Sequence, residues 1–176
     1  MMNLDTYLYR LQFETGKLSP LDWEADWDDA PLSYKIYRNL PAFPLSLEVP
    51  LTLEEAEQIV KPNRNIIGHF LWYVYGLTQV SQSLIDSEMM QSFRRFPPSG
   101  GGLYPNELYV YLNLEDIPIG VYHYDVAHHQ LILLREGNFD TYISKALGNR
   151  SDLSTSFAVA IVSSVFWKNF FKYHNF

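Results

Sequence analysis

The chain has 176 residues, which is enough for one ordinary domain or for a domain with a smaller appendage. Its 47% hydrophobic and 16% aromatic content suffices for a packed core, and its formal charge of -7 argues against nucleic acid or an anionic membrane as the main partner. The sequence contains no cysteine, so disulfides, thiol nucleophiles and thiolate metal sites are excluded.

The sequence predicts neither a secretory signal nor a membrane span. Asp5 and Arg10 interrupt the apolar positions of residues 1–11, which is not typical of a signal peptide. The longest apolar runs, such as residues 157–162, are far too short to cross a bilayer. We therefore expect a soluble, cytoplasmic protein.

The first fifty residues predict a helix followed by an extended arm. Apolar residues recur at helical spacing near the N-terminus, which predicts an amphipathic helix over residues 5–15. Repeated prolines in residues 19–50, together with the acidic, tryptophan-bearing stretch 22–29, indicate an extended arm that lies on another surface. We assign residues 1–50 to this helix and arm, and residues 51–176 to a second domain.

Two further helices are predicted at the start of the second domain. Thr52 and Glu55 form a capping-box pair, which predicts a short helix over residues 53–60. A longer helix is expected to begin at residues 62–63 and to end near Gly76. Its apolar residues cover more than one face, which predicts that the helix is buried.

The second half of the chain alternates between strand-like and helix-like segments. Three β-prone runs are predicted strands: residues 107–114, 120–124 and 130–135. The last two are joined as a hairpin, and a helix is expected over residues 139–147. The continuous apolar run 157–166 is rich in β-branched residues, which predicts a central strand buried on both faces. Residues 78–96 are polar and leave both a helix and a mobile loop open.

The segment 98–105 reads Pro-Ser-Gly-Gly-Gly-Leu-Tyr-Pro and carries the strongest chemical signal. Its three glycines let backbone N–H groups approach a ligand where a Cβ would block them, so the segment can serve as a cofactor cradle. An ordinary turn is the alternative. The segment lacks the lysine of a P-loop, and Pro105 stands where a dinucleotide fingerprint requires glycine or alanine, so neither ATP nor NAD is favoured.

Two pairs of polar residues are further candidates for chemistry. Lys172 and Tyr173 follow the predicted buried strand. A lysine among neighbouring phenylalanines would be desolvated, which favours its neutral, basic form, and an adjacent hydroxyl could share a proton. A purely structural role for this pair is the alternative.

Arg94 and Arg95 could bind a phosphate, or could form a solvated basic pair on a loop.

Three histidines are candidates for metal ligands. His128 and His129 are adjacent on the expected turn and cannot easily point at one metal, although His123 could reach across the hairpin. Because solvated turn histidines are far commoner than ligands, we predict no metal site.

Three segments in this order resemble one family. They are Arg-Phe-Pro-Pro-Ser-Gly-Gly-Gly-Leu-Tyr-Pro-Asn-Glu-Leu-Tyr at 95–109, Gly-Val-Tyr-His-Tyr-Asp at 120–125 with His-Gln-Leu at 129–131, and Phe-Lys-Tyr at 171–173. They resemble the SagB-type dehydrogenase branch of the FMN-dependent nitroreductase superfamily, and the resemblance spans about residues 53–176. It implies an α+β, nitroreductase-like mixed sheet flanked by helices. It also implies an FMN-dependent oxidoreductase that oxidises peptide thiazolines and oxazolines to azoles.

The resemblance also implies roles for particular residues. The flavin would be lined by the family's proline-serine loop, which here comprises Pro98, Ser99, Gly100, Gly101 and Gly102. The family's Lys-Tyr motif maps onto Lys172 and Tyr173, with the lysine as the base and the tyrosine positioning or relaying the proton. Arg94 or Arg95 would contact the FMN phosphate.

The resemblance further implies an obligate homodimer with each flavin at the subunit interface, a peptide or small-molecule substrate, and other proteins of a peptide-modification complex as partners. In the family the Lys-Tyr motif opens a long helix of the dimer core, whereas this sequence ends at Phe176. We therefore expect a partial flavin domain, either a fragment of a longer enzyme or a truncation completed by a partner. The alternative is a non-catalytic module that binds peptides or supports assembly.

Overall fold

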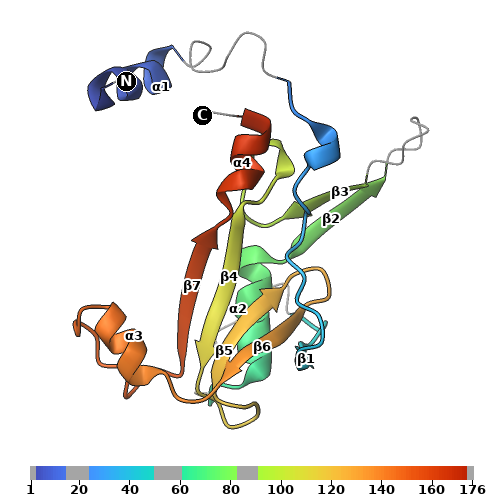
Figure 1. Ribbon diagram of the computed structural model, residues 1–176. Helices are drawn as coiled ribbons and strands as arrows, with labels where there is room; N and C mark the ends of the chain where they lie inside the picture. The colour runs from blue at the N-terminus through green and yellow to red at the C-terminus, as the bar shows by residue number, and fades with distance from the viewer. Residues whose placement is uncertain (1–2, 15–23, 50–60, 83–90, 174–176) are drawn as a thin grey trace. The chain divides into compact units, whose positions relative to one another are not determined.

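A computed structural model describes residues 3–14, 24–49, 61–82 and 91–173 (Figure 1). The chain divides into two compact units. The first unit contains residues 1–33, 99–106 and 164–176, and the second contains residues 34–98 and 107–163. The expected helix over 53–60, with its capping pair Thr52 and Glu55, lies outside the described residues.

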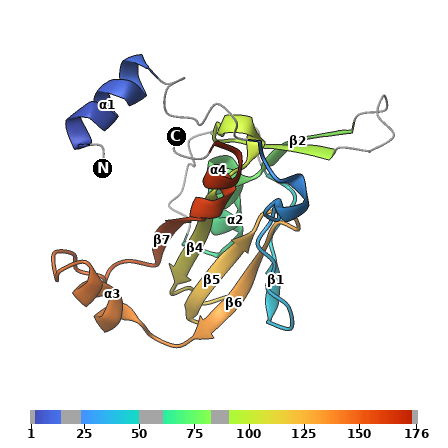
Figure 2. The same cartoon turned by 45° about the horizontal axis from the view of Figure 1, so that its top comes forward.

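A five-stranded sheet is the centre of the second unit, and Figure 2 shows its strands side by side. Its order is β1-β6-β5-β4-β7. The strands are β1 (Ala42–Pro44), β4 (Asn106–Leu112), β5 (Gly120–Asp125), β6 (Gln130–Glu136) and β7 (Ala158–Ser164). The predicted strands and the β5–β6 hairpin are therefore confirmed. Antiparallel pairing places Tyr109 opposite His123 and His123 opposite Ile132.

Helix α2 (Arg64–Tyr75) packs on one face of this sheet. It begins after Asn63, whose side chain accepts a hydrogen bond from the Ile66 N–H, and it ends at Gly76, close to the predicted limits. Leu71 is fully buried in the core, whereas Phe70, on another face of the helix, is 48% exposed. The prediction of burial over more than one face is therefore wrong for the described residues, because the sheet covers only one side of the helix.

The core between α2 and the sheet follows the alternation of the strands. Leu108, Val110 and Leu112 on β4 point toward α2, together with Tyr122 and Leu131 on the neighbouring strands. These side chains are between 0% and 5% exposed. The sheet is therefore fixed in register, because a shift by one residue would turn this set away from the helix.

Strand β7 lies at one edge of the described sheet and not at its centre. β4 is its described neighbour, and the two are linked at their ends by the Asn113 N–H to the Phe157 oxygen, 2.9 Å, and the Val165 N–H to the Pro105 oxygen, 2.7 Å. Val162 is 65% exposed. The strand is present, but the prediction that it is central is wrong. An apolar run shows that a strand can be buried, whereas its position in the sheet depends on which other strands pair with it.

The described parts of residues 78–96 are strands, contrary to the expected helix or mobile loop, and residues 83–90 lie outside the described residues. β2 (Leu77–Gln82) pairs with β3 (Gln91–Arg95) in an antiparallel arrangement, with a register irregularity between Leu77 and Gln79. The polar residues in these runs weakened the strand signal of the sequence, although pairing satisfies the backbone groups.

The arm is extended over its second half and joins the sheet through β1. Phe43 stands opposite Leu131, and the Leu45 N–H donates to the His129 oxygen at 3.1 Å. Pro44 is tolerated here because β1 is an edge strand. The expected extended arm is thus present and also supplies a strand. Helix α3 (Asp140–Ala146) matches the helix expected over 139–147.

The first unit contains the remaining helical elements. Helix α1 (Leu4–Phe13) lies within one or two residues of the predicted helix, and the Asn3 side chain caps it by accepting from the Thr6 N–H at 2.7 Å. The other elements are the 3-10 turn η2 (Trp27–Asp29), the 3-10 turn η3 (Gly100–Gly102) and helix α4 (Phe166–Tyr173).

Candidate functional site

The glycine segment folds into a closed turn within the first unit. The Gly102 N–H donates to the Ser99 oxygen at 3.1 Å, and the Leu103 N–H donates to the Gly100 oxygen at 3.3 Å. The Ser99 hydroxyl oxygen also accepts from the Tyr104 N–H at 2.9 Å. The serine before the glycines therefore closes the loop through both its backbone and its side chain.

Three residues of this loop have left-handed backbone conformations. The φ angles are 59° at Gly101, 69° at Gly102 and 46° at Tyr104. Glycine adopts such angles without steric cost, which explains two of the three positions. Tyr104 carries a side chain, and a non-glycine residue in this region is retained where its surroundings hold it there.

Helix α4 begins directly after β7 and carries the predicted Lys-Tyr pair in its last turn. The Val165 N–H donates to the Pro105 oxygen at 2.7 Å, which ties the start of the helix to the exit of the glycine loop. Within α4, Lys168 and Phe171 are buried, while Lys172 and Tyr173 are half-buried. The predicted pair therefore lies at the boundary between the packed interior and the surface.

The glycine loop and the Lys-Tyr pair meet, although they are far apart in the sequence. A Cβ added at Gly101 would lie 2.5 Å from the Tyr173 hydroxyl oxygen and 2.8 Å from Lys172 Nζ. A Cβ added at Gly100 would lie 3.6 Å from the Tyr173 ring, which is an ordinary contact. The absence of a side chain at Gly101 is thus what allows both polar groups to approach the loop backbone.

Trp27 of the arm also contacts α4. Its ring meets Phe171 edge to face with centroids 5.4 Å apart, and Lys172 Nζ lies 5.8 Å from the Trp27 ring centre. The indole is 63% exposed. The sequence placed Trp27 in an acidic stretch of the arm but gave no signal that it reaches Lys172, because that contact depends on tertiary structure.

Lys168 was likewise not predicted. It is only 4% exposed, and its Nζ donates to the Ser33 oxygen at 3.1 Å and to the Tyr104 oxygen at 3.3 Å. Its spacing of four residues from Lys172 places both lysines on the same side of the helix, but the sequence gave no signal of its burial, which depends on these distant carbonyls.

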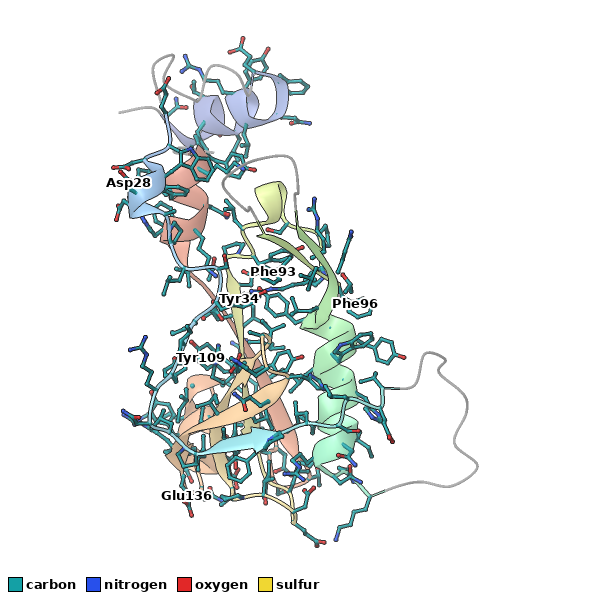
Figure 3. All side chains as sticks on the ribbon, turned by 90° about the vertical axis from the view of Figure 1, so that its right-hand side faces the viewer. Asp28, Tyr34, Phe93, Phe96, Tyr109 and Glu136 are labelled. Atoms are coloured by element: carbon teal, nitrogen blue, oxygen red, sulfur yellow. The ribbon has the colours of Figure 1, made fainter. Side chains whose placement is uncertain are left out.

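The two predicted arginines lie on β3 of the second unit, and they differ. Arg95 is 6% exposed, and its guanidinium lies 5.2 Å from the Tyr34 ring centre and 4.7 Å from that of Tyr75. Figure 3 labels Tyr34 and Phe93, whose rings pack edge to face at 5.3 Å. Arg94, by contrast, is exposed. Cation–π packing holds Arg95 in the interior, while Arg94 is accessible to a ligand.

The three histidines contact separate partners. His123 Nε2 is 3.1 Å from Glu107 Oε2 in the buried sheet, His128 Nδ1 is 2.8 Å from Asp125 Oδ2, and His129 Nδ1 is 2.8 Å from the Tyr124 hydroxyl. Burial lowers the pKa of His129 below its ordinary value. Across the described ranges, no group of three histidine or carboxylate side chains is placed to hold a metal ion.

A second polar cluster lies where the arm crosses the sheet. Lys35 Nζ donates to the Tyr109 hydroxyl at 2.7 Å, and the Tyr37 hydroxyl is 3.3 Å from the same oxygen. The hydrogen bond to Tyr109 raises the pKa of Lys35. Tyr37 and Tyr109 each pack against the His123 ring, at 5.0 and 5.1 Å (Figure 3 labels Tyr109). This cluster fastens the arm to the sheet within the second unit.

Comparisons with known proteins give a likeness to a solved structure. No family model matches the chain, and no curated protein matches it. Among solved structures, a protein from Anabaena variabilis, provisionally described as a nitroreductase, aligns with a TM-score of 0.71 and 25% sequence identity. The alignment covers 87% of this chain but only 30% of that protein.

In the residues that the structure describes, no helix is both long and apolar enough to cross a membrane.

The likeness confirms the predicted α+β fold, an antiparallel sheet with flanking helices. Nitroreductases generally use FMN and are commonly homodimeric. Because of the structural likeness, we describe the chain as having a nitroreductase-like fold, which is in general a fold of flavin oxidoreductases.

Proposed function

We propose that this chain is part of an FMN-dependent oxidoreductase of the SagB type, which oxidises thiazolines or oxazolines in peptides to azoles. One observation carries the proposal: the glycine loop and the Lys-Tyr pair, which the sequence singled out separately, lie against each other at Gly101. An ordinary turn does not require two polar side chains of a distant helix to converge on one of its glycines.

The loop fits a flat, polar cofactor. Gly100 and Gly101 are exposed and carry no Cβ, so a planar ring system can approach their backbone. Pro98 and Ser99 would line the same side, and the Ser99–Tyr104 hydrogen bond keeps the loop in shape before a ligand binds. Of the two arginines proposed for the FMN phosphate, Arg94 is exposed, whereas the Arg95 guanidinium packs against the rings of Tyr34 and Tyr75.

Residues of this chain would accept and transfer the proton that leaves the azoline ring. Aromatisation of an azoline removes a proton from one ring carbon and a hydride from the neighbouring ring carbon, and bound FMN would supply the hydride acceptor. Lys172 is the base in this proposal and takes the carbon proton. The Trp27 ring near Lys172 Nζ would favour the resulting ammonium ion. The Tyr173 hydroxyl, which reaches the same backbone position, would orient the substrate or pass the proton on.

Association of two copies belongs to the same proposal. Large apolar side chains are exposed on α4, where Phe166 is 72% and Trp167 is 41% exposed. On α2, Phe70 is 48% exposed. Apolar surfaces of this kind favour a symmetric homodimer. Light scattering at micromolar concentration checks this part: we expect twice the monomer mass, and a stable monomer would contradict it.

Flavin titration tests the proposed function. Purified, flavin-free chain is titrated with FMN while flavin fluorescence is followed, and riboflavin, which lacks the phosphate, serves as the comparison ligand. We expect saturable FMN binding, weakened in Arg94→Gln but not in Arg38→Gln, an exposed arginine of the arm. Failure of the full chain to bind FMN would contradict the proposal and favour the non-catalytic module.

A further inference from the structure

Lys168 is buried, at 4% exposed, and has no role in the proposed chemistry. Lysine is almost never fully buried unless its ammonium group is paired, because burial of an uncompensated charge is costly. Here the ammonium group donates to two backbone carbonyls, Ser33 O at 3.1 Å and Tyr104 O at 3.3 Å. The partners belong to the arm and to the exit of the glycine loop, so one side chain joins three segments of the first unit.

The contact to Tyr104 falls at the strained position of the loop. Tyr104 has a φ of 46°, and its N–H is used to close the loop on the Ser99 hydroxyl. Its carbonyl accepts from Lys168, while the next carbonyl, Pro105 O, accepts from the Val165 N–H. Two successive carbonyls at the loop exit are therefore held by Val165, just before α4, and by Lys168, in its first turn.

The hydrogen bond from Lys168 to the Ser33 oxygen attaches the arm to α4. Trp27 lies six residues before Ser33 and packs against Phe171 and near Lys172. Lys168 and Lys172 are four residues apart, which is about one helical turn. The same helix thus anchors the arm at its first turn and meets the arm's tryptophan at its last.

We propose that Lys168 is a positioning residue: its buried ammonium group locks the glycine loop and the arm onto α4, and so sets the loop against Lys172 and Tyr173. The consequence for FMN rests on the proposed function, whereas the consequence for the loop does not. Loss of the ammonium group leaves two carbonyls without their charged donor, which costs about ten- to a hundredfold in the stability of the closed loop.

The test replaces only the ammonium group. Lys168→Met keeps the unbranched side chain as far as Cε and removes its donors, and Lys145→Met, at an exposed lysine of α3, is the control. Because the chain has no cysteine, Lys168→Cys supplies a single thiol. Alkylation of the unfolded Lys168→Cys chain with 2-bromoethylamine restores an ammonium group at nearly lysine length. Alkylation with iodoethane gives a neutral side chain that lacks only the ammonium group, and both products are refolded alongside wild type.

Two readouts are measured on the full chain. Hydrogen exchange reports the Gly102, Leu103 and Tyr104 amides, whose donors close the loop. FMN affinity reports the proposed cofactor site. We expect Lys168→Met and the ethylated form to exchange about tenfold faster at these amides and to bind FMN about tenfold more weakly, with both values restored in the aminoethylated form.

The inference is overturned if folded Lys168→Met matches wild type in loop exchange, or if the aminoethylated and ethylated forms behave alike. If Lys168→Met does not fold, the two alkylated forms are compared instead. Only the aminoethylated form should then show the wild-type rate of hydrogen exchange at the loop amides. If wild type itself fails to bind FMN, the proposed function is wrong, and loop exchange alone decides the role of Lys168.

Discussion

Replacement of Gly101 by alanine should separate two requirements that meet at one residue. The first is conformational: Gly101 has a φ of 59°, and an alanine there should cost roughly 1–2 kcal/mol in the free energy of unfolding. The second is spatial, because the new Cβ would lie 2.5 Å from the Tyr173 hydroxyl oxygen and 2.8 Å from Lys172 Nζ. Both contacted atoms end flexible side chains, so we expect these side chains to move and the loop to persist.

Gly100→Ala is the matched control. Its Cβ would make only an ordinary 3.6 Å contact with the same Tyr173 ring, and Gly100 has no left-handed φ angle. Removal of glycine's freedom in the unfolded chain can even stabilise the protein at such a position, by about 0.4–1 kcal/mol. The two neighbouring substitutions should therefore differ in sign or clearly in size.

Two measurements on the full chain check this prediction. Urea unfolding gives the difference in stability between the two alanine variants. Carbon-13 NMR of labelled tyrosine, with the Tyr173 signal assigned by its loss in Tyr173→Phe, reports whether the ring has moved. A displaced signal is expected in Gly101→Ala and not in Gly100→Ala. Equal stability of the two variants with unmoved Tyr173 signals would refute the proximity of the loop and the Lys-Tyr pair.

Two predictions concern the second unit. Leu71→Ala should lower the free energy of unfolding by about 2–5 kcal/mol because Leu71 is fully buried against the sheet, whereas Phe70→Ala, at a 48% exposed position, should cost far less in the same urea titration. His129 should make the free energy of unfolding depend on pH, because burial lowers its pKa in the folded chain. Just below pH 6.5 the unfolded chain therefore binds more protons than the folded chain. The free energy of unfolding should fall as the pH decreases from about 6.5 toward the lowered pKa. His129→Asn, which retains a residue tolerant of the 48° φ angle, should flatten this dependence, and an unchanged pH profile would assign it to other groups.

Elements with complete local signals were predicted well. Asn63 and Gly76 mark the two ends of α2, and the alternation of β5 and β6 around a turn of polar residues predicted their hairpin. The glycine loop and Lys172 with Tyr173 were singled out by their residue types and by the family resemblance, and their roles stay a prediction. Each of these signals lies within a few residues of the element that it predicts.

Features that depend on distant partners were missed. The order of strands places β7 at the edge of the described sheet, and nothing within residues 157–166 encodes that position. β2 and β3 stabilise each other although neither has a strong pattern of its own. The burial of Lys168 depends on carbonyls of Ser33 and Tyr104, which no reading of α4 alone would reveal.

The central claim is that Lys172 acts as the base beside a flavin held by the glycine loop. Rapid mixing of the flavin-loaded enzyme with an azoline-containing peptide measures the rate of flavin reduction directly. A positioned base contributes about a hundred- to ten-thousandfold, so Lys172→Ala should slow this step by roughly that factor, while Lys145→Ala should not. FMN affinity should be unchanged in both variants. A wild-type rate of flavin reduction in FMN-loaded Lys172→Ala would contradict the claim.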